Sequence, residues 1–188
     1  MQMPTLKTLL FLSAIIILSL SVHTTDSPAC AGGKVEPIGA FTNMRFTEEH
    51  AYGYTVELWR DGDRLFGFLM VSEGLAGDTP TGLLEDVNYD QATHRLAFRA
   101  RLSMGLFYDK THNGAPSQDV FRFKGILRKD EVTGSVEHTN MLTPEASPQR
   151  EDVVLKHSAE QSGDMPVYEN YEGWKRVADE ILKRRGPK

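Results

Sequence analysis

The sequence predicts an all-β protein: an antiparallel up-and-down meander of about eight strands, closed into a barrel or folded into a sandwich, followed by a C-terminal α-helix. Two observations support this prediction. Short apolar stretches recur between residues 39 and 157, and most are separated only by turn residues. Residues 166–183 instead carry apolar side chains three or four positions apart, which is the helical period. A barrel is favoured because closure removes exposed strand edges.

Residues 1–31 are predicted to be a leader. Lys7 precedes an uncharged, mostly apolar run over residues 9–22. This run has about the length of a signal-peptide core and is shorter than the roughly 20 residues of a transmembrane helix. Ala29-Cys30-Ala31 then offers a small-x-small cleavage site before Gly32. The alternatives for this run are a buried core helix and an uncleaved membrane anchor. We expect a secreted or periplasmic protein, or one anchored in the membrane by this leader.

Cys30 is the only cysteine of the chain. Its surroundings resemble a bacterial lipobox at Ala29 and depart from it at Ser27 and Pro28. Lipidation of Cys30 is therefore an alternative to simple cleavage, and membrane contact is expected only through the leader or a lipidated Cys30. A domain without a further cysteine suits an oxidising compartment and argues against thiol catalysis.

Composition excludes several classes of protein. With 40% apolar residues the chain is too hydrophobic to be disordered, and one cysteine allows neither a disulfide framework nor a multi-cysteine zinc site. A net charge of −5 argues against a nucleic-acid-binding protein, which needs a basic footprint. One core can hold the rest of the chain together, and we expect a barrel domain over residues 32–165 and a helix over residues 166–188.

The strands follow from local pattern. Residues 54–60 alternate apolar and polar side chains, and Asp61-Gly62-Asp63 then supplies residue types that tolerate a positive φ. Residues 64–72 are apolar on both faces, as in a central strand, whereas residues 95–102 alternate cleanly. In order, the predicted strands are residues 39–47, 54–60, 64–72, 83–89, 95–102, 120–127, 131–138 and 152–157.

The predicted C-terminal helix is amphipathic. Its apolar stripe includes Tyr171, Trp174 and Ile181, with acidic residues near its start and basic residues at its end, which suits the helix dipole. Gly186-Pro187 ends it. We expect this helix to pack against the outside of the sheet or across one end of it, with a membrane-surface role as the alternative.

This order of elements resembles the lipocalin and calycin barrels. Those barrels begin their first strand with Gly-x-Trp, and this chain has Gly39-Ala40-Phe41 near the corresponding point, with Phe in place of Trp. The resemblance covers most of the chain after the leader in organisation but only these residues in motif. It implies an up-and-down barrel with a ligand cavity at its mouth.

The leading functional hypothesis is therefore a barrel that binds a small apolar or amphipathic ligand. Its lining is expected from the side chains predicted to face inward, for which ordinary core filling is the alternative interpretation. The expected ligand-binding residues are Tyr54, Val56, Leu58, Phe66, Phe68, Glu85, Phe98, Phe121 and Phe123. Loops at residues 72–82 and 106–119 are longer than the hairpin turns and are the expected rim, with Glu73, Asp78, Thr79, Tyr108 and His112 as candidates.

Charged residues on the predicted strands leave two questions open. Glu85 shares a face with Leu83 and Val87, so it points inward and needs a partner, unless a bulge shifts the alternation and exposes it. A basic set on two strands either is the solvated face of the sheet or lines an anion-binding cavity. This set comprises Arg95, Arg99, Arg101, Arg122 and Lys124.

The histidines lack the spacing of a metal site, and no nucleophile elbow is present in the sequence. We therefore expect no metal and no cofactor, and the sequence contains no catalytic motif that supports an enzyme. The alternative functions are an envelope interaction module with a filled barrel or sandwich, whose partner binds the two long loops, and a hydrolase or isomerase that uses Glu85 or Asp109 with His112.

Overall fold

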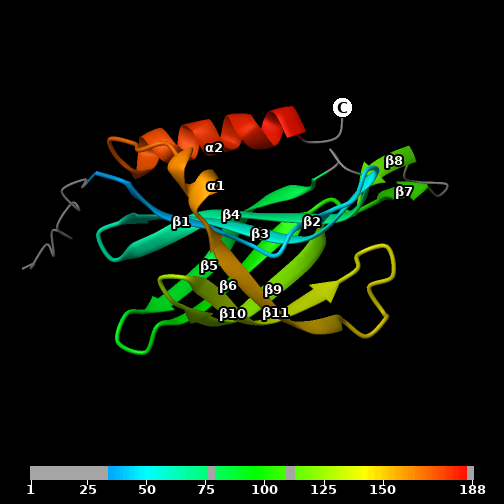
Figure 1. Cartoon of the computed structure of the whole chain (residues 1–188). Coiled ribbons are helices and arrows are strands. Elements are labelled where there is room, and N and C mark those ends of the chain that lie inside the picture. The colour runs from blue at the N-terminus through cyan, green and yellow to red at the C-terminus, as the bar shows by residue number, and fades with distance from the viewer. Residues whose placement is uncertain (1–33, 76–78, 109–112, 186–188) are drawn as a thin grey trace, which may run out of the picture. The chain divides into compact units, whose positions relative to one another are not determined.

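The computed structural model describes residues 34–75, 79–108 and 113–185, and every structural statement below concerns these residues. All of them lie in the unit Gly32–Lys188. Figure 1 shows that this part of the chain is a strongly curved antiparallel sheet with a helix along its outside.

Eight strands close a barrel. Each pairs antiparallel with the next in sequence, and the first, β1, pairs with both β3 and the last strand, β11. The strands are β1 (Glu36–Thr42), β3 (His50–Asp61), β4 (Arg64–Leu75), β5 (Thr81–Asp90), β6 (Arg95–Leu102), β9 (Asp119–Leu127), β10 (Glu131–Thr139) and β11 (Gln149–Ser158). The predicted up-and-down meander is confirmed, and of the two predicted forms the barrel occurs.

Five short or terminal elements complete the described chain. β2 (Arg45–Phe46) continues the line of β1 beside β3, and β7 (Leu106–Tyr108) pairs with β8 (Asn113–Pro116) in a separate ribbon. The predicted helix occurs as α2 (Tyr171–Arg185), and it begins later than expected. A short helix, α1 (Ala159–Gly163), precedes it and has no counterpart in the sequence prediction.

The two ends of the barrel differ in their connections. Asp61 pairs with Arg64, so the β3–β4 turn consists of Gly62 and Asp63, and Gly62 has a φ of 58° as its turn type requires. This turn and those between β5 and β6 and between β9 and β10 lie at one end, the short-turn end. The connections β4–β5, β6–β9 and β10–β11 lie at the opposite end, the loop end.

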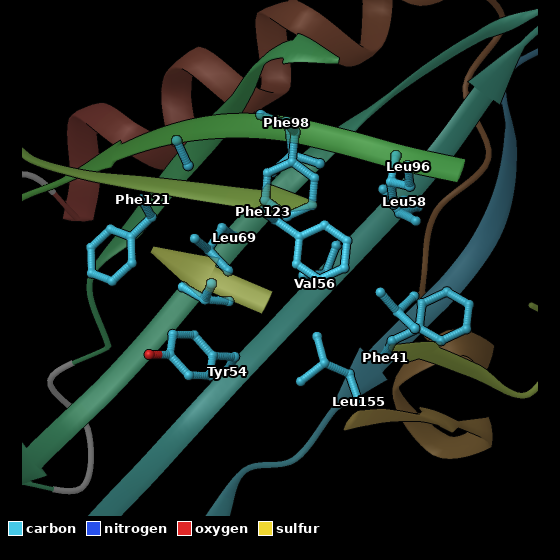
Figure 2. Packing of buried hydrophobic residues seen from close by; sticks show 14 of the residues in the cluster. Phe41, Tyr54, Val56, Leu58, Leu69, Leu96, Phe98, Phe121, Phe123 and Leu155 are labelled. Atoms are coloured by element: carbon cyan, nitrogen blue, oxygen red, sulfur yellow. The ribbon is translucent and has the colours of Figure 1, made fainter. Parts of the chain in front are cut away.

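The barrel interior is an apolar cluster to which all eight strands contribute. Figure 2 shows its side chains converging from facing walls, with Tyr54 and Val56 on one side and Phe121 and Phe123 on another. Phe98 and Phe123 are directly opposite each other in β6 and β9, and their rings stack at 5.0 Å. Phe41, the aromatic residue of the Gly39-Ala40-Phe41 motif, is buried in this cluster.

A second apolar cluster lies on the outer face of the barrel beneath α2. Trp174 of α2 packs on Phe66, with ring centroids 4.5 Å apart, and also contacts Trp59 and Phe68. The indole N–H of Trp59 donates to the carbonyl of Pro166 at 3.0 Å, which fixes the segment leading into the helix. α2 therefore packs on the outside of the barrel, along β3 and β4 (Figure 1).

The expected inward orientation of Phe66 and Phe68 is wrong. Both belong to the outer cluster, whereas Leu65, Leu69 and Val71 face the interior. Because β4 is apolar on both faces, alternation alone does not distinguish the face under the helix from the face in the barrel.

The predicted inward orientation of Glu85 is also wrong, because a bulge in β5 shifts the alternation. The β5–β6 register shifts between Glu85 and Asn88, and Asp86 has a φ of 52°. Before the bulge, Leu84 faces the interior; after it, Val87 and Tyr89 do. Glu85 consequently lies on the outer face.

Candidate functional site

The barrel wall opens between β4 and β5. These strands pair only from Phe68 to Met70 against Leu83 to Thr81, so the first part of β4 and the last part of β5 separate toward the short-turn end. A cavity of about 720 Å³ occupies this opening, within the range of small-molecule sites. Its lining residues are Asp63, Arg64, Leu65, Phe66, Leu83, Leu84, Glu85, Asp86, Val87, Asn88, Tyr89, Tyr171, Trp174 and Lys175. We call it the wall cavity.

The wall cavity joins the two apolar clusters. Leu65 and Leu84 belong to the interior cluster, and Val87 and Tyr89 pack against it. The lining from Phe66, Tyr171 and Trp174 belongs to the outer cluster or packs against it. A ligand in this cavity therefore contacts both the inner side of the wall and the helix that covers its outside.

The start of α2 forms the outer rim of the wall cavity. The side chain of Asn170 accepts a hydrogen bond from the backbone N–H of Gly173 at 2.9 Å and so caps the first turn. The ring of Tyr171 packs edge-on against Phe66 at 4.9 Å, and the guanidinium carbon of Arg64 lies 3.6 Å from the Tyr171 ring centroid. This cation–π contact links the β3–β4 hairpin to the helix.

Most charged groups of the lining are paired. Glu85 accepts from Arg99 at 2.8 Å and lies 3.5 Å from Arg101, while Asp86 lies 3.2 Å from Arg99. Lys175 binds Asp179 one turn further along α2.

Two charged groups of the lining lack such a pair in the described chain. Asp63 accepts a hydrogen bond from the Gln91 side chain at 3.1 Å, which directs it toward the β5–β6 turn. Arg64 has Tyr171 as its partner, and among the described residues no carboxylate lies within ion-pair distance of it. Its guanidinium is therefore the available cation at the rim.

A second hollow, the outer groove, crosses the outer face near the loop end and has a volume of about 940 Å³. It is lined by Met44 and Phe46 around β2, by Met70 and Leu83, by Thr79 of the β4–β5 connection and by Leu106 of β7, among others. Phe46 is 70% exposed and Leu106 39% exposed, so apolar surface reaches solvent here.

Polar side chains partly close the loop end from inside. The buried pair Asp119 and His138 are 2.8 Å apart, and Phe121 stacks on the His138 ring at 4.2 Å. The other oxygen of Asp119 accepts the backbone N–H of Met141, which ties the β10–β11 connection to the barrel. This carboxylate therefore has a structural partner on each oxygen.

Tyr54 links two strands that do not pair. Its hydroxyl donates to Glu151 of β11, near the loop end. Burial is the main cause that raises the pKa of Tyr54 above its ordinary value, and the hydrogen bond to Glu151 and the charges of Glu151 and Glu73 raise it further. Tyr54 is thus held protonated.

The predicted lining residues separate into three groups. Tyr54, Val56, Leu58, Phe98, Phe121 and Phe123 are in the interior cluster. Phe66 lines the wall cavity from outside, and Phe68 lies in the outer cluster. Glu85 lines both hollows on the outer face. Their ligand-binding role stays a prediction.

The predicted rim residues are only partly within the described chain. Glu73 is exposed near the end of β4, and Thr79 lines the outer groove. Tyr108 lies in β7. Asp78, His112, Asp109 and Cys30 lie outside the described residues, so the lipidation of Cys30 and the hydrolase alternative with His112 stay untested.

The basic set lies on the outer face of neighbouring strands. Arg99 is directly opposite Arg122, and Lys124 is opposite Ala97, because β6 pairs with β9. Ion pairs with Glu85 and Glu137 neutralise part of this row. Since Leu96, Phe98 and Ala100 fill the interior from the same strand, the set does not line the barrel interior.

Sequence reasoning missed most of the wall cavity. Arg64, Leu84, Tyr89 and Trp174 were visible only as ordinary strand or helix positions, and no motif links them. Aromatic residues in the C-terminal helix were the one available signal. The surface of β4 and β5 that these aromatic residues contact depends on where the two strands stop pairing with each other, and residue types alone do not reveal that point.

Comparison of the chain with protein-family models, with curated proteins and with solved structures finds no match. In the described parts of the chain, no helix has both the length and the apolar character needed to cross a membrane. The same parts contain no group of three or more His, Cys, Asp or Glu side chains able to hold a metal ion. The wall cavity and the outer groove are thus the features from which a function can be argued.

Proposed function

We propose that the chain is an exported, lipocalin-like barrel that binds a small apolar or amphipathic molecule in the wall cavity. The observation that carries this proposal is the loss of β4–β5 pairing, which leaves a cavity of about 720 Å³ lined from both apolar clusters. Export is proposed from the N-terminal sequence alone, with its lysine, short apolar run and small-x-small site.

The composition of the lining favours an organic ligand over an ion. Leu65, Leu84 and Val87 offer aliphatic surface, and Tyr89 and Trp174 offer aromatic surface beside it. Apolar ligands gain about 25 cal/mol for each Å² of apolar surface that leaves water. Binding sites of this kind combine mostly apolar walls with a few polar groups that orient the ligand.

Two experiments test the proposal. Mass spectrometry of the denatured, natively purified protein should detect a co-purified lipid or other small molecule. Titration with the neutral dye Nile red should show saturable binding of one molecule per chain. Val87→Trp places an indole in the wall cavity and should weaken Nile red binding by about tenfold or more. A tenfold loss of affinity corresponds to about 1.4 kcal/mol of binding free energy.

Val154→Trp is the matched control. Val154 is 49% exposed on β11 and does not line the wall cavity, so this variant should bind Nile red as the wild type does. The proposal is wrong if Val87→Trp binds like the wild type or if both variants lose binding equally.

An interaction module is the second candidate function, favoured by the outer groove. Leu106 belongs to one of the two loops that were expected to bind a partner, and the exposed Phe46 of β2 lines the same groove. Under this function, cross-linking in the native envelope captures a protein partner, Phe46→Ser abolishes capture, and no small molecule co-purifies. Loss of capture without any change in Nile red binding would separate the outer groove from the wall cavity.

A further inference from the structure

We propose that the ligand of the wall cavity is an anionic amphiphile, whose carboxylate or similar head group binds Arg64 and whose apolar part enters between β4 and β5. This inference rests on the proposed function and assigns the chemical class of its ligand. Three observations support it: the state of the charges at the rim, the position of Arg64, and the polarity of the lining behind it.

The charges at the rim favour an anion. Lys175 is already bound to Asp179, and the carboxylates of Glu85 and Asp86 are paired with arginines of β6. Asp63 is directed toward Gln91. Arg64 is therefore the cation of the lining that has no carboxylate partner in the described chain, and a ligand carboxylate can pair with it without displacing an existing ion pair.

Arg64 is also held in position. Its guanidinium carbon lies over the face of the Tyr171 ring, 3.6 Å from the ring centroid. This contact does not use the N–H donors of Arg64 for a hydrogen bond. A guanidinium presents five N–H donors at its edge, in a geometry that matches a carboxylate. Anchoring on Tyr171 lowers the loss of side-chain freedom when an anion binds.

The lining behind Arg64 suits an apolar body. The next residue, Leu65, already faces the interior cluster, and Leu84 and Val87 are on the opposite side of the opening. Trp174 also lines the cavity, and its buried indole N–H has no hydrogen-bond partner in the described chain.

The test compares three probes with the same alkyl chain and different head groups: dodecanoate, dodecanol and dodecyltrimethylammonium. Each is titrated near neutral pH, below its aggregation threshold, against wild-type protein, with calorimetry as the readout. Dodecanoate should bind most tightly and dodecyltrimethylammonium least. Arg64→Gln should weaken dodecanoate binding by about tenfold or more, the value of one charged hydrogen bond, and leave dodecanol binding unchanged.

Two further variants separate charge from structure. Arg64→Lys keeps a cation beside Tyr171 and should recover most of the dodecanoate affinity. Arg60→Gln removes a nearby cation on the same hairpin, one that lies 3.9 Å from Glu36 and does not line the wall cavity, and should change nothing. Thermal unfolding of each variant shows that the fold is retained.

The outcomes distinguish the two proposals. If none of the three probes binds saturably, the proposed function fails and the head-group assignment fails with it. If all three bind equally, or if Arg64→Gln weakens dodecanol as much as dodecanoate, ligand binding stands and the anionic class is overturned. Selective loss of dodecanoate in Arg64→Gln, with recovery in Arg64→Lys, supports the assignment.

Discussion

Gly125 of β9 and Gly134 of β10 face each other, and their strands approach closely there. A Cβ on Gly125 would lie 2.1 Å from the carbonyl oxygen of Thr133 and 2.5 Å from the Phe123 ring. Gly125→Ala should therefore lower the free energy of unfolding by about 1–3 kcal/mol, the usual cost of overpacking. Denaturant unfolding followed by circular dichroism measures the change.

Gly74→Ala is the control for this prediction. Gly74 also lies in a strand, but a Cβ there would meet no atom within 4 Å. Its substitution should leave stability within about 0.5 kcal/mol of the wild type. Equal effects at the two glycines would contradict the close approach of β9 and β10.

Tyr54 predicts a loss of stability at alkaline pH. Its pKa is raised in the folded protein, chiefly by burial, so above about pH 10 the unfolded chain loses a proton that the folded chain keeps. Stability due to Tyr54 is therefore present below that pH and falls as the pH rises further, by up to about 1.4 kcal/mol per pH unit.

Tyr54→Phe should remove this contribution to the pH dependence, and unfolding free energies measured on either side of pH 10 give the slope. Glu151→Gln removes the acceptor charge but not the burial, so it should keep part of the slope. An unchanged slope in Tyr54→Phe would show that Tyr54 is not held protonated.

Single side chains show where sequence reasoning stops. The alternation that places Phe98 and Phe123 in the interior also gives Glu85 the wrong face, because the bulge at Asp86 restarts the alternation within one strand. Bulges are set by pairing with the neighbouring strand, which the residues of β5 alone do not reveal. Phe66 and Phe68 were misplaced because β4 is buried on both sides.

At the level of elements, α2 depends on one aromatic anchor. Trp174 is buried among Phe66, Phe68 and Trp59 of the outer cluster. Trp174→Ala should cost about 3–5 kcal/mol and loosen the helix, because a large cavity replaces the indole. Urea unfolding measures the loss, and a red shift in the fluorescence of Trp59, the remaining tryptophan, should report exposure of the cluster.

Val177→Ala tests whether the effect belongs to the anchor or to the helix. Val177 is on the same helix and 36% exposed, so its truncation should cost no more than about 0.5 kcal/mol. If both substitutions destabilise equally, the helix is held by its whole length rather than by Trp174.

Long elements were predictable from sequence and short ones were not. The eight barrel strands carry enough alternation or apolar length to be recognised, and α2 shows the helical period. β2, β7, β8 and α1 are too short to show a period. The separation of β4 from β5, on which the candidate site depends, leaves no trace in either strand's own pattern.

For the whole molecule, topology followed from connection length. Short turns force consecutive strands into antiparallel pairs, which predicts a meander. Whether the meander closes depends on the register between its first and last strands, which are far apart in sequence. Here Ala40–Thr42 of β1 pair with 156–158 of β11 while the same strand pairs with β3, and this dual pairing makes the barrel.

The central claim is that ligand binds in the wall cavity, and backbone amide chemical shifts measured by NMR during a dodecanoate titration test it most directly. If the ligand binds in the wall cavity, saturable shifts should be concentrated at residues 63–66, 83–89 and 171–175, which contain the lining residues. Shifts confined to the outer groove, around Phe46, Met70 and Leu106, or no saturable shifts at all, would contradict it.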